Sequence, residues 1–152
     1  IAIVSQDTIL FNETVYYNIA YGRPDASPGK VEEAARLACI HEFIMKQPNG
    51  YQTIVGERGL KLSGGERQRI GIARAIIKKT KIFVFDEATS ALDSFTEREI
   101  FDGLKEVSKG RSTLAIAHRL STIKDADEIL VISEGVVKEQ GRHEDLLELK
   151  GM

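Results

Sequence analysis

Two adjacent carboxylates, Asp86 and Glu87, directly follow an uninterrupted apolar run, IFVF at residues 82–85. Such a run is typical of a strand buried on both faces. Two carboxylates at its tip are costly unless they are paired, solvated or bound to a cation. One could support Mg²⁺ while the other polarises a nucleophilic water as general base. The alternative is a strand that simply ends in solvent.

A helix start suited to an anion lies in LSGGERQRIGIAR, residues 62–74. Ser63 is the expected N-cap, and Glu66 completes a capping box. Gly64 and Gly65 lack a Cβ, so their amides can approach a ligand closely, and the positive end of the helix favours phosphate. The alternative is an ordinary capped amphipathic helix. Two glycines in its first turn cost about 1 kcal/mol each relative to alanine, which favours a role other than stability.

Two further polar residues follow predicted strands. Gln6 comes after IAIV at residues 1–4, and His118 comes after STLAIA at residues 112–117. Taken alone, Gln6 is more simply a polar loop residue and His118 a structural histidine. Ligands gather at the carboxyl ends of parallel strands, so the matching positions make both residues site candidates.

The elements that must position these residues alternate between strand and helix. The patterns predict a hairpin of residues 128–133 and 136–140, with turn material at residues 22–29. Within residues 62–74 and just beyond, Ile70, Ala73 and Ile77 fall on the face expected to be buried. Further helices are predicted over about residues 30–38, 41–46, 96–108 and 142–149. The alternation indicates an α/β fold with a parallel sheet.

Composition narrows the functional classes. The 152 residues suffice for one domain with a core, and 21 basic against 23 acidic residues give a net charge of −2, which lacks the basic footprint of a nucleic-acid binder. The lone Cys39 is expected to be a small core residue. There is no apolar run of transmembrane length and no signal-peptide pattern. Because the first residue is Ile1, inside a predicted strand, we expect a fragment of a longer protein.

Five motifs now occur in order: VSQD around Gln6, LSGGERQ at residues 62–68, the strand ending in Asp86 and Glu87, SALD at residues 90–93, and AIAHR around His118. They resemble the Q-loop, signature motif, Walker B motif, D-loop and switch histidine of ABC-type ATPases. FNETVYYNIAYG and TIVGERGLKLSGG resemble the exporter branch. Within it, the chain is most similar to the half-transporters of the mitochondrial iron–sulfur-related and bacterial heavy-metal export group.

The resemblance implies a catalytic role for three residues and a metal role for two. Glu87 would be the general base and His118 would contact the γ-phosphate of ATP. Asp86 and Gln6 would support Mg²⁺, and Gln6 would also sense the attacking water. The implied substrate and cofactor are therefore ATP and Mg²⁺.

The resemblance also implies contacts between domains. Ser63, Gly64, Gly65 and Gln68 would contact ATP bound to the opposite protomer. The dimer interface would contain Ser90 and Asp93.

The implied partners are a second ABC ATPase domain, packed head to tail, and the transmembrane domain of the same transporter. The membrane contact would involve the Q-loop and the loop from Thr53 to Gly59. No nucleic acid is expected. The protein would be membrane-associated, with its ATPase domain on the cytoplasmic or organelle-matrix side. The transported substrate is chosen by membrane helices outside this sequence, and homodimer or heterodimer stays open.

One motif of the family is missing, because the sequence contains no G-x-x-x-x-G-K-[ST]. In the family this P-loop precedes the Q-loop, so we expect it to be absent by truncation and the isolated chain to be inactive. The implied fold is P-loop NTPase-like without its N-terminal part: a parallel-sheet core (residues 1–6 and 81–140), an inserted, mainly helical signature subdomain (residues 7–79) and a C-terminal helix (residues 141–152).

Two other functions remain. A soluble ABC ATPase of DNA-repair or chromosome type would predict coiled-coil sequence and DNA binding. The exporter-like residues around Tyr16 and Glu57 argue against it. A non-hydrolysing interaction module would be a stand-alone half domain that does not respond to ATP.

Overall fold

The structure is a computed structural model of the chain, and it describes residues 1–86, 95–96, 100, 108–116 and 123–148. The chain divides into two compact units, Ile1–Ile116 and Ala117–Met152. Each unit is described by itself. Among the residues described, no helix combines the length and the apolar character needed to cross a membrane.

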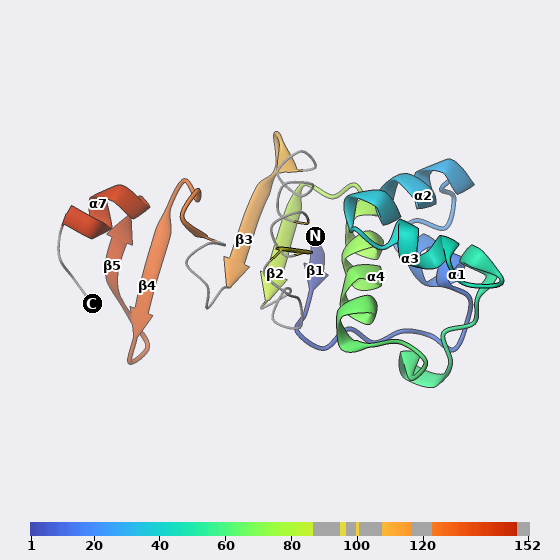
Figure 1. Cartoon of the computed structure of the whole chain (residues 1–152). Coiled ribbons are helices and arrows are strands. Elements are labelled where there is room, and N and C mark those ends of the chain that lie inside the picture. The colour runs from blue at the N-terminus through green and yellow to red at the C-terminus, as the bar shows by residue number, and fades with distance from the viewer. Residues whose placement is uncertain (87–94, 97–99, 101–107, 117–122, 149–152) are drawn as a thin grey trace. The chain divides into compact units, whose positions relative to one another are not determined.

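The first unit contains a parallel sheet in the order β1 (Ala2–Val4), β2 (Ile82–Asp86) and β3 (Ser112–Ile116). In the register, Val4 pairs with Phe85, and Phe85 pairs with Ala115. The arrowheads of these strands lie at the same end of the sheet (Figure 1). The expected α/β class with a parallel sheet is confirmed.

Only one face of this sheet is well buried. Phe83 and Phe85 are 1% and 4% exposed, whereas Ile3 is 66% exposed and Leu114 is 57% exposed. In β2 itself, Ile82 is 40% exposed and Val84 is half-buried, so the expectation that residues 82–85 form a strand buried on both faces is wrong. Successive side chains of a strand point to opposite faces, and the face that carries Phe83 and Phe85 is the one that packs into the core cluster with residues of α1, α2 and α4.

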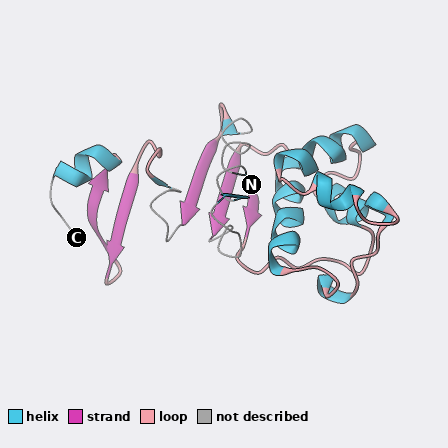
Figure 2. Cartoon of the chain, in the orientation of Figure 1, coloured by secondary structure: helices cyan, strands magenta, loops and turns pink. Residues whose placement is uncertain are grey.

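Helices α1 (Val15–Ala20), α2 (Pro28–Leu37), α3 (His41–Met45) and α4 (Gly64–Ile77) lie between β1 and β2 in the chain, with short 3₁₀ turns at Gly50–Gln52 and Glu57–Gly59. Figure 2 shows them gathered beside the strands. Thr14 is the N-cap of α1, and its hydroxyl accepts from the Tyr17 amide at 3.0 Å. Helix α2 begins two residues before the predicted start, because Pro28 occupies a first-turn position that needs no amide donor.

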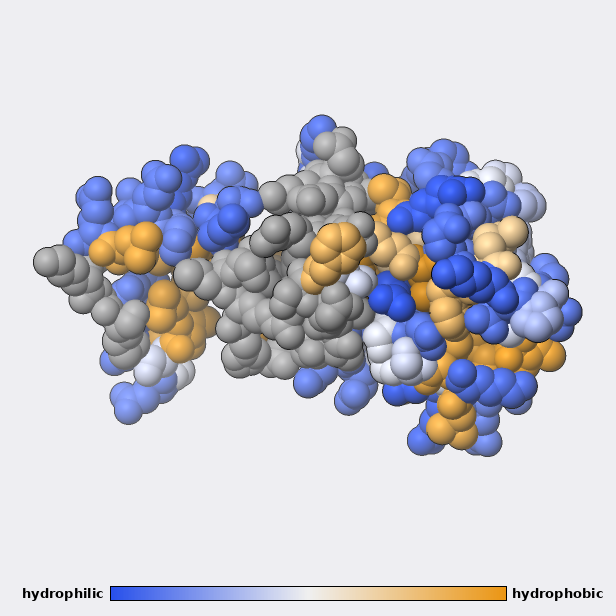
Figure 3. Space-filling model, viewed as in Figure 1, coloured by the Kyte–Doolittle hydropathy of each residue, from blue (hydrophilic) through white to orange (hydrophobic). Residues whose placement is uncertain are grey.

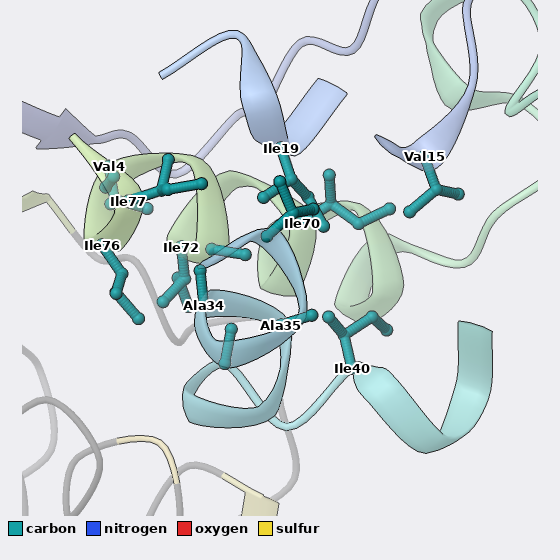
Figure 4. Packing of buried hydrophobic residues seen from close by; sticks show 14 of the residues in the cluster. Val4, Val15, Ile19, Ala34, Ala35, Ile40, Ile70, Ile72, Ile76 and Ile77 are labelled. Atoms are coloured by element: carbon teal, nitrogen blue, oxygen red, sulfur yellow. The ribbon is translucent and has the colours of Figure 1, made fainter. Parts of the chain in front are cut away.

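The hydrophobic core of this unit surrounds α4. Ile70, Ala73 and Ile77 are all buried, which confirms the predicted face. Figure 4 shows side chains of β1, α1, α2 and α4 meeting in one cluster. Cys39 is half-buried against this cluster, in agreement with a structural role. Hydrophilic residues cover much of the described surface in one view, with hydrophobic residues between them (Figure 3).

The second unit contains an antiparallel hairpin of β4 (Ile129–Ser133) and β5 (Val136–Gly141), followed by α7 (His143–Glu148). The hairpin and the final helix were both predicted. Glu134 and Gly135 connect the strands with φ of 53° and 75°, the left-handed conformation that tight hairpin turns require. The proposed boundaries between the sheet core, the helical subdomain and the C-terminal helix stay a prediction.

Replacing Gly22 by alanine is expected to destabilise the chain by about 1–3 kcal/mol through overpacking. A Cβ at this position would lie 2.1 Å from the carbonyl oxygen of Arg74, which is backbone of α4 and cannot move aside. Gly29→Ala is the matched control, because nothing lies within 4 Å of its Cβ position in α2. Chemical denaturation measures both, and equal effects of the two variants would contradict this account of packing.

Candidate functional site

The N-terminus of α4 carries the predicted capping box. The Ser63 hydroxyl accepts from the Glu66 amide at 3.3 Å, and the Glu66 carboxylate accepts from the Ser63 amide at 2.7 Å. The first amides of a helix have no intrahelical partner. In the described part of the chain, the box leaves the amides of Gly64 and Gly65 as the open donors of this turn. Ser63 and Gly64 are exposed, so a ligand can reach them.

Gln6 and Asp86 are brought to one edge of the sheet. Gln6 follows the end of β1 by two residues, and Asp86 is the last residue of β2. Both are exposed. Because Val4 and Phe85 are register partners in parallel strands, the segments that follow them leave the sheet at the same end. That end is also where α4 begins (Figure 1).

Four predicted site residues, Glu87, Ser90, Asp93 and His118, lie outside the described residues. Their roles stay predictions. Glu87 is the next residue after Asp86, and His118 follows the end of β3 by two residues. Among the described residues no group of three or more potential metal-ligating side chains is found.

Gln68, predicted to contact ATP, is 1% exposed and belongs to the buried side of α4. Its neighbour Arg67 donates to the Leu62 carbonyl at 2.7 Å and so braces the chain where it enters the helix. The role of Gln68 toward ATP stays a prediction.

The loop from Thr53 to Gly59 is fastened to the start of α1. The Val15 amide donates to the Thr53 carbonyl at 2.9 Å, and the Val55 amide donates to the Glu13 carbonyl at 3.1 Å. Beyond these bonds the loop turns sharply, with positive φ at Gly56, Arg58 and Gly59. The two segments that resemble the exporter branch are therefore paired in the structure.

Sequence analysis missed a polar group at the centre of this region, formed by Asn18 and Arg74. Asn18 is fully buried, and its side chain bonds the backbone of Phe11 and Thr14. Arg74 donates to the Asn18 carbonyl and side-chain oxygen, both at 2.8 Å, and to the Ile9 carbonyl at 3.0 Å. A polar Asn within the apolar stretch of α1 was the available signal.

Three aromatic residues surround this group at the surface. Phe11, Tyr17 and Tyr21 are 40–52% exposed, and their ring centroids lie 4.6–6.1 Å apart. The guanidinium of Arg74 lies 5.6 Å from the Phe11 ring centroid and 5.9 Å from that of Tyr21, within the range of cation–π attraction. Burial lowers the pKa of Arg74, although an arginine stays charged at physiological pH.

His41 has a structural role. It is 8% exposed, and its Nδ1 lies 2.8 Å from the hydroxyl of Tyr51. Burial raises the pKa of the Tyr51 phenol to about 12, so this group stays neutral at physiological pH. The pair fastens α3 to the Gly50–Gln52 turn that leads into the loop from Thr53.

A cavity of about 350 Å³ lies at the opposite end of α4 from Ser63. Residues of α2, the end of α4 and the segment just before β3 line it, among them Ala34, Ile76 and Arg111. Because it is remote from the start of α4 and from the carboxyl ends of the strands, this cavity is separate from the predicted nucleotide-contacting residues.

A parallel sheet whose strand ends meet a capped, glycine-rich helix start defines an α/β nucleotide-binding class of protein. The family model described as "ABC transporter" matches residues 1–90, and the chain belongs to this family. Membership implies ATP binding.

The relatives refine this assignment. The chain is 55% identical over 152 residues to an "ATM1-type heavy metal exporter" of Novosphingobium aromaticivorans, covering all of this chain and 25% of that protein. It is 54% identical over 147 residues to the mitochondrial "Iron-sulfur clusters transporter ABCB7" of Homo sapiens, covering 97% of this chain and 20% of that protein.

A solved structure of a bacterial Atm1-family ABC exporter with ATP bound matches with a TM-score of 0.95 and 55% identity, over 99% of this chain and 26% of that chain. The expected subgroup is confirmed. The chain spans about a fifth to a quarter of the length of these relatives.

Replacing Ser63 by alanine is expected to cost about 1 kcal/mol of stability, because the Glu66 amide loses its cap. Ser27→Ala is the matched control, since Ser27 is the N-cap of α2 but makes no side-chain cap hydrogen bond. Its expected cost is smaller. Urea denaturation of both variants checks the difference, and a Ser27 effect as large as that of Ser63 would refute it.

Proposed function

We propose that this chain is the signature-bearing part of an ATP-hydrolysing domain that powers an Atm1-type membrane exporter. The observation that carries the proposal is the meeting of the α4 N-terminus with the carboxyl ends of β1 and β2 at one end of the first unit. The names of the relatives, which include a heavy metal exporter and an iron–sulfur cluster transporter, support the export function.

The start of α4 contacts ATP that is held mainly by a second ABC ATPase domain. The Ser63 hydroxyl and the open amides of Gly64 and Gly65 face the γ-phosphate, and the helix dipole favours its negative charge. Gln68 supports this contact from within the helix. ATP therefore lies at the interface, between the start of α4 on one domain and the P-loop of the other.

The exposed oxygens of Gln6 and Asp86 suit Mg²⁺, which prefers oxygen ligands and retains several waters. When bound, Mg²⁺ neutralises charge on the β- and γ-phosphates. Glu87 accepts a proton from the attacking water as the new P–O bond forms, and His118 donates a hydrogen bond to a γ-phosphate oxygen. The bond to the β-phosphate breaks, releasing ADP and inorganic phosphate.

Two such domains pack head to tail, with Ser90 and Asp93 in their interface. ATP stabilises the closed dimer because it contacts both domains, and hydrolysis removes that contact. The opening and closing move the transmembrane domain of the same transporter.

The membrane domain contacts the Q-loop around Gln6 and the loop from Thr53 to Gly59. Backbone bonds between Val15 and Thr53 and between Val55 and Glu13 bring that loop to the start of α1. The exposed aromatic residues Phe11, Tyr17 and Tyr21 lie on and beside the same helix. The ATPase domain accordingly lies on the cytoplasmic or organelle-matrix side of the membrane. The relatives are transporters rather than chromosome proteins, which disfavours the DNA-repair alternative.

The isolated 152-residue chain is expected to bind ATP weakly or not at all and not to turn it over, because it has no P-loop to hold the β- and γ-phosphates. Calorimetric titration with MgATP and a phosphate-release assay measure both properties. ATPase activity of the isolated chain that disappears in Glu87→Gln would overturn this expectation.

In the full-length transporter, Glu87→Gln is expected to lower ATP turnover by about 10²–10⁴-fold, the usual contribution of a general base. The closed dimer should accumulate because hydrolysis no longer opens it. Glu134→Gln, in the exposed turn of the β4–β5 hairpin, is the matched control and should hydrolyse ATP normally. Unimpaired turnover of Glu87→Gln would remove Glu87 from this role.

A further inference from the structure

Arg74 joins three parts of the chain that are distant in sequence. It lies on α4, and its guanidinium donates to the backbone of Ile9, beyond the Q-loop, and to both oxygens of Asn18 in α1. The guanidinium offers its donors in a fixed planar fork, so three bonds hold its partners in one geometry. Among the described residues no carboxylate forms an ion pair with Arg74.

Asn18 extends this fastening to the segment that follows Gln6. Its amide nitrogen donates to the carbonyls of Phe11 and Thr14, and its oxygen accepts from the Phe11 amide at 2.9 Å. That oxygen is the same atom that accepts from Arg74. The position of the Phe11 backbone therefore depends on Arg74 through Asn18.

A close contact fixes the same segment nearer to Gln6. A Cβ on Gly71 would lie 2.6 Å from the Thr8 side chain, so Thr8 rests directly on α4 one turn before Arg74. Thr8 is two residues from Gln6. The chain from Thr8 to Phe11 thus follows the surface of α4 over about one helical turn.

Helix α4 connects this fastening to the signature residues. From Ser63 to Arg74 is three helical turns, about 16 Å at 1.5 Å per residue. Eight of the fourteen residues of the helix are buried, all of them between Gln68 and Ile77, so close packing holds this part of α4 against local bending. A shift of Ile9 or Asn18 is therefore transmitted to the helix start, and a shift of the helix start to the Q-loop side.

We infer that Arg74 is a positioning residue that makes the Q-loop segment, α1 and the signature helix one mechanical unit. This inference rests on the proposed function. A displacement imposed by the membrane domain near Phe11, Tyr17 and Tyr21 then reaches Ser63 and Gly65 at the γ-phosphate through Arg74 and α4. Arg74 itself does not touch ATP.

The test uses the full-length transporter and measures kcat and KM for MgATP in wild type, Arg74→Ala and Arg74→Lys. Loss of the guanidinium hydrogen bonds in Arg74→Ala is expected to lower kcat about 10- to 100-fold, the usual consequence of a misplaced reacting group. KM should change less than about threefold, because the P-loop that holds ATP is outside this chain. Lysine should not rescue kcat, since one ammonium cannot reproduce the geometry of three guanidinium bonds.

The matched control is Lys78→Ala, an exposed cation at the end of the same helix, which should behave as wild type. Restoration of kcat by Arg74→Lys would show that charge alone is needed and would overturn the inference. The inference would also be overturned if Arg74→Ala lost kcat and thermal stability together and Arg74→Lys restored both. If the wild-type transporter shows no ATPase activity that depends on Glu87, the proposed function is wrong. The fastening by Arg74 is then tested by hydrogen exchange alone.

If Arg74→Ala does not fold, hydrogen exchange of Arg74→Lys supplies the second measurement. The Phe11 amide, bonded to Asn18, should exchange at least about tenfold faster than in wild type, with amides in the middle of α4 unchanged. Unchanged exchange at Phe11 would show that Arg74 does not fasten this segment.

Discussion

Close approach of the backbone to helix α4 is the constraint on which the rest of the structure depends. Gly22 and Gly71 have no room for a Cβ, because the Arg74 carbonyl and the Thr8 side chain occupy that space. The segment after β1 and the end of α1 therefore lie against α4 with almost nothing between them. That approach buries the helix on most sides and leaves its first turn, at Ser63 and Gly64, open to a ligand.

Local signals in the sequence were sufficient for most of the described elements and for the positions of Ser63, Gln6 and Asp86 at or just beyond the ends of elements. The capping box of Ser63 and Glu66 depends on residues three apart, and the hairpin turn depends on Glu134 and Gly135 alone. Gln6 and Asp86 were expected at the same edge of the sheet because the carboxyl ends of parallel strands lie at one edge. Such features are decided by neighbours in the chain, so a single sequence contains them.

Features decided by distant residues were not predictable in this way. Arg74 reads as one more cation on an amphipathic helix, and its partners Asn18 and Ile9 are 56 and 65 residues away. The exposure of Ile3 and Leu114 depends on which face the helices cover, which an apolar run does not reveal. The roles of Glu87 and His118 came from family resemblance together with their position after strands.

Electrostatics explains why the proposed site needs a second domain. Asp86, Glu87 and the phosphates of ATP are all negative, and like charges 4 Å apart near a protein surface repel by about 4 kcal/mol. The helix dipole at Ser63 offsets only about 0.3–1 kcal/mol of this. The remainder requires Mg²⁺ and the P-loop lysine, which this sequence lacks. Under the proposed function, affinity for ATP comes chiefly from the other domain, and these residues act on the γ-phosphate after the two surfaces meet. In the proposed mechanism, hydrolysis is therefore conditional on closure of the dimer.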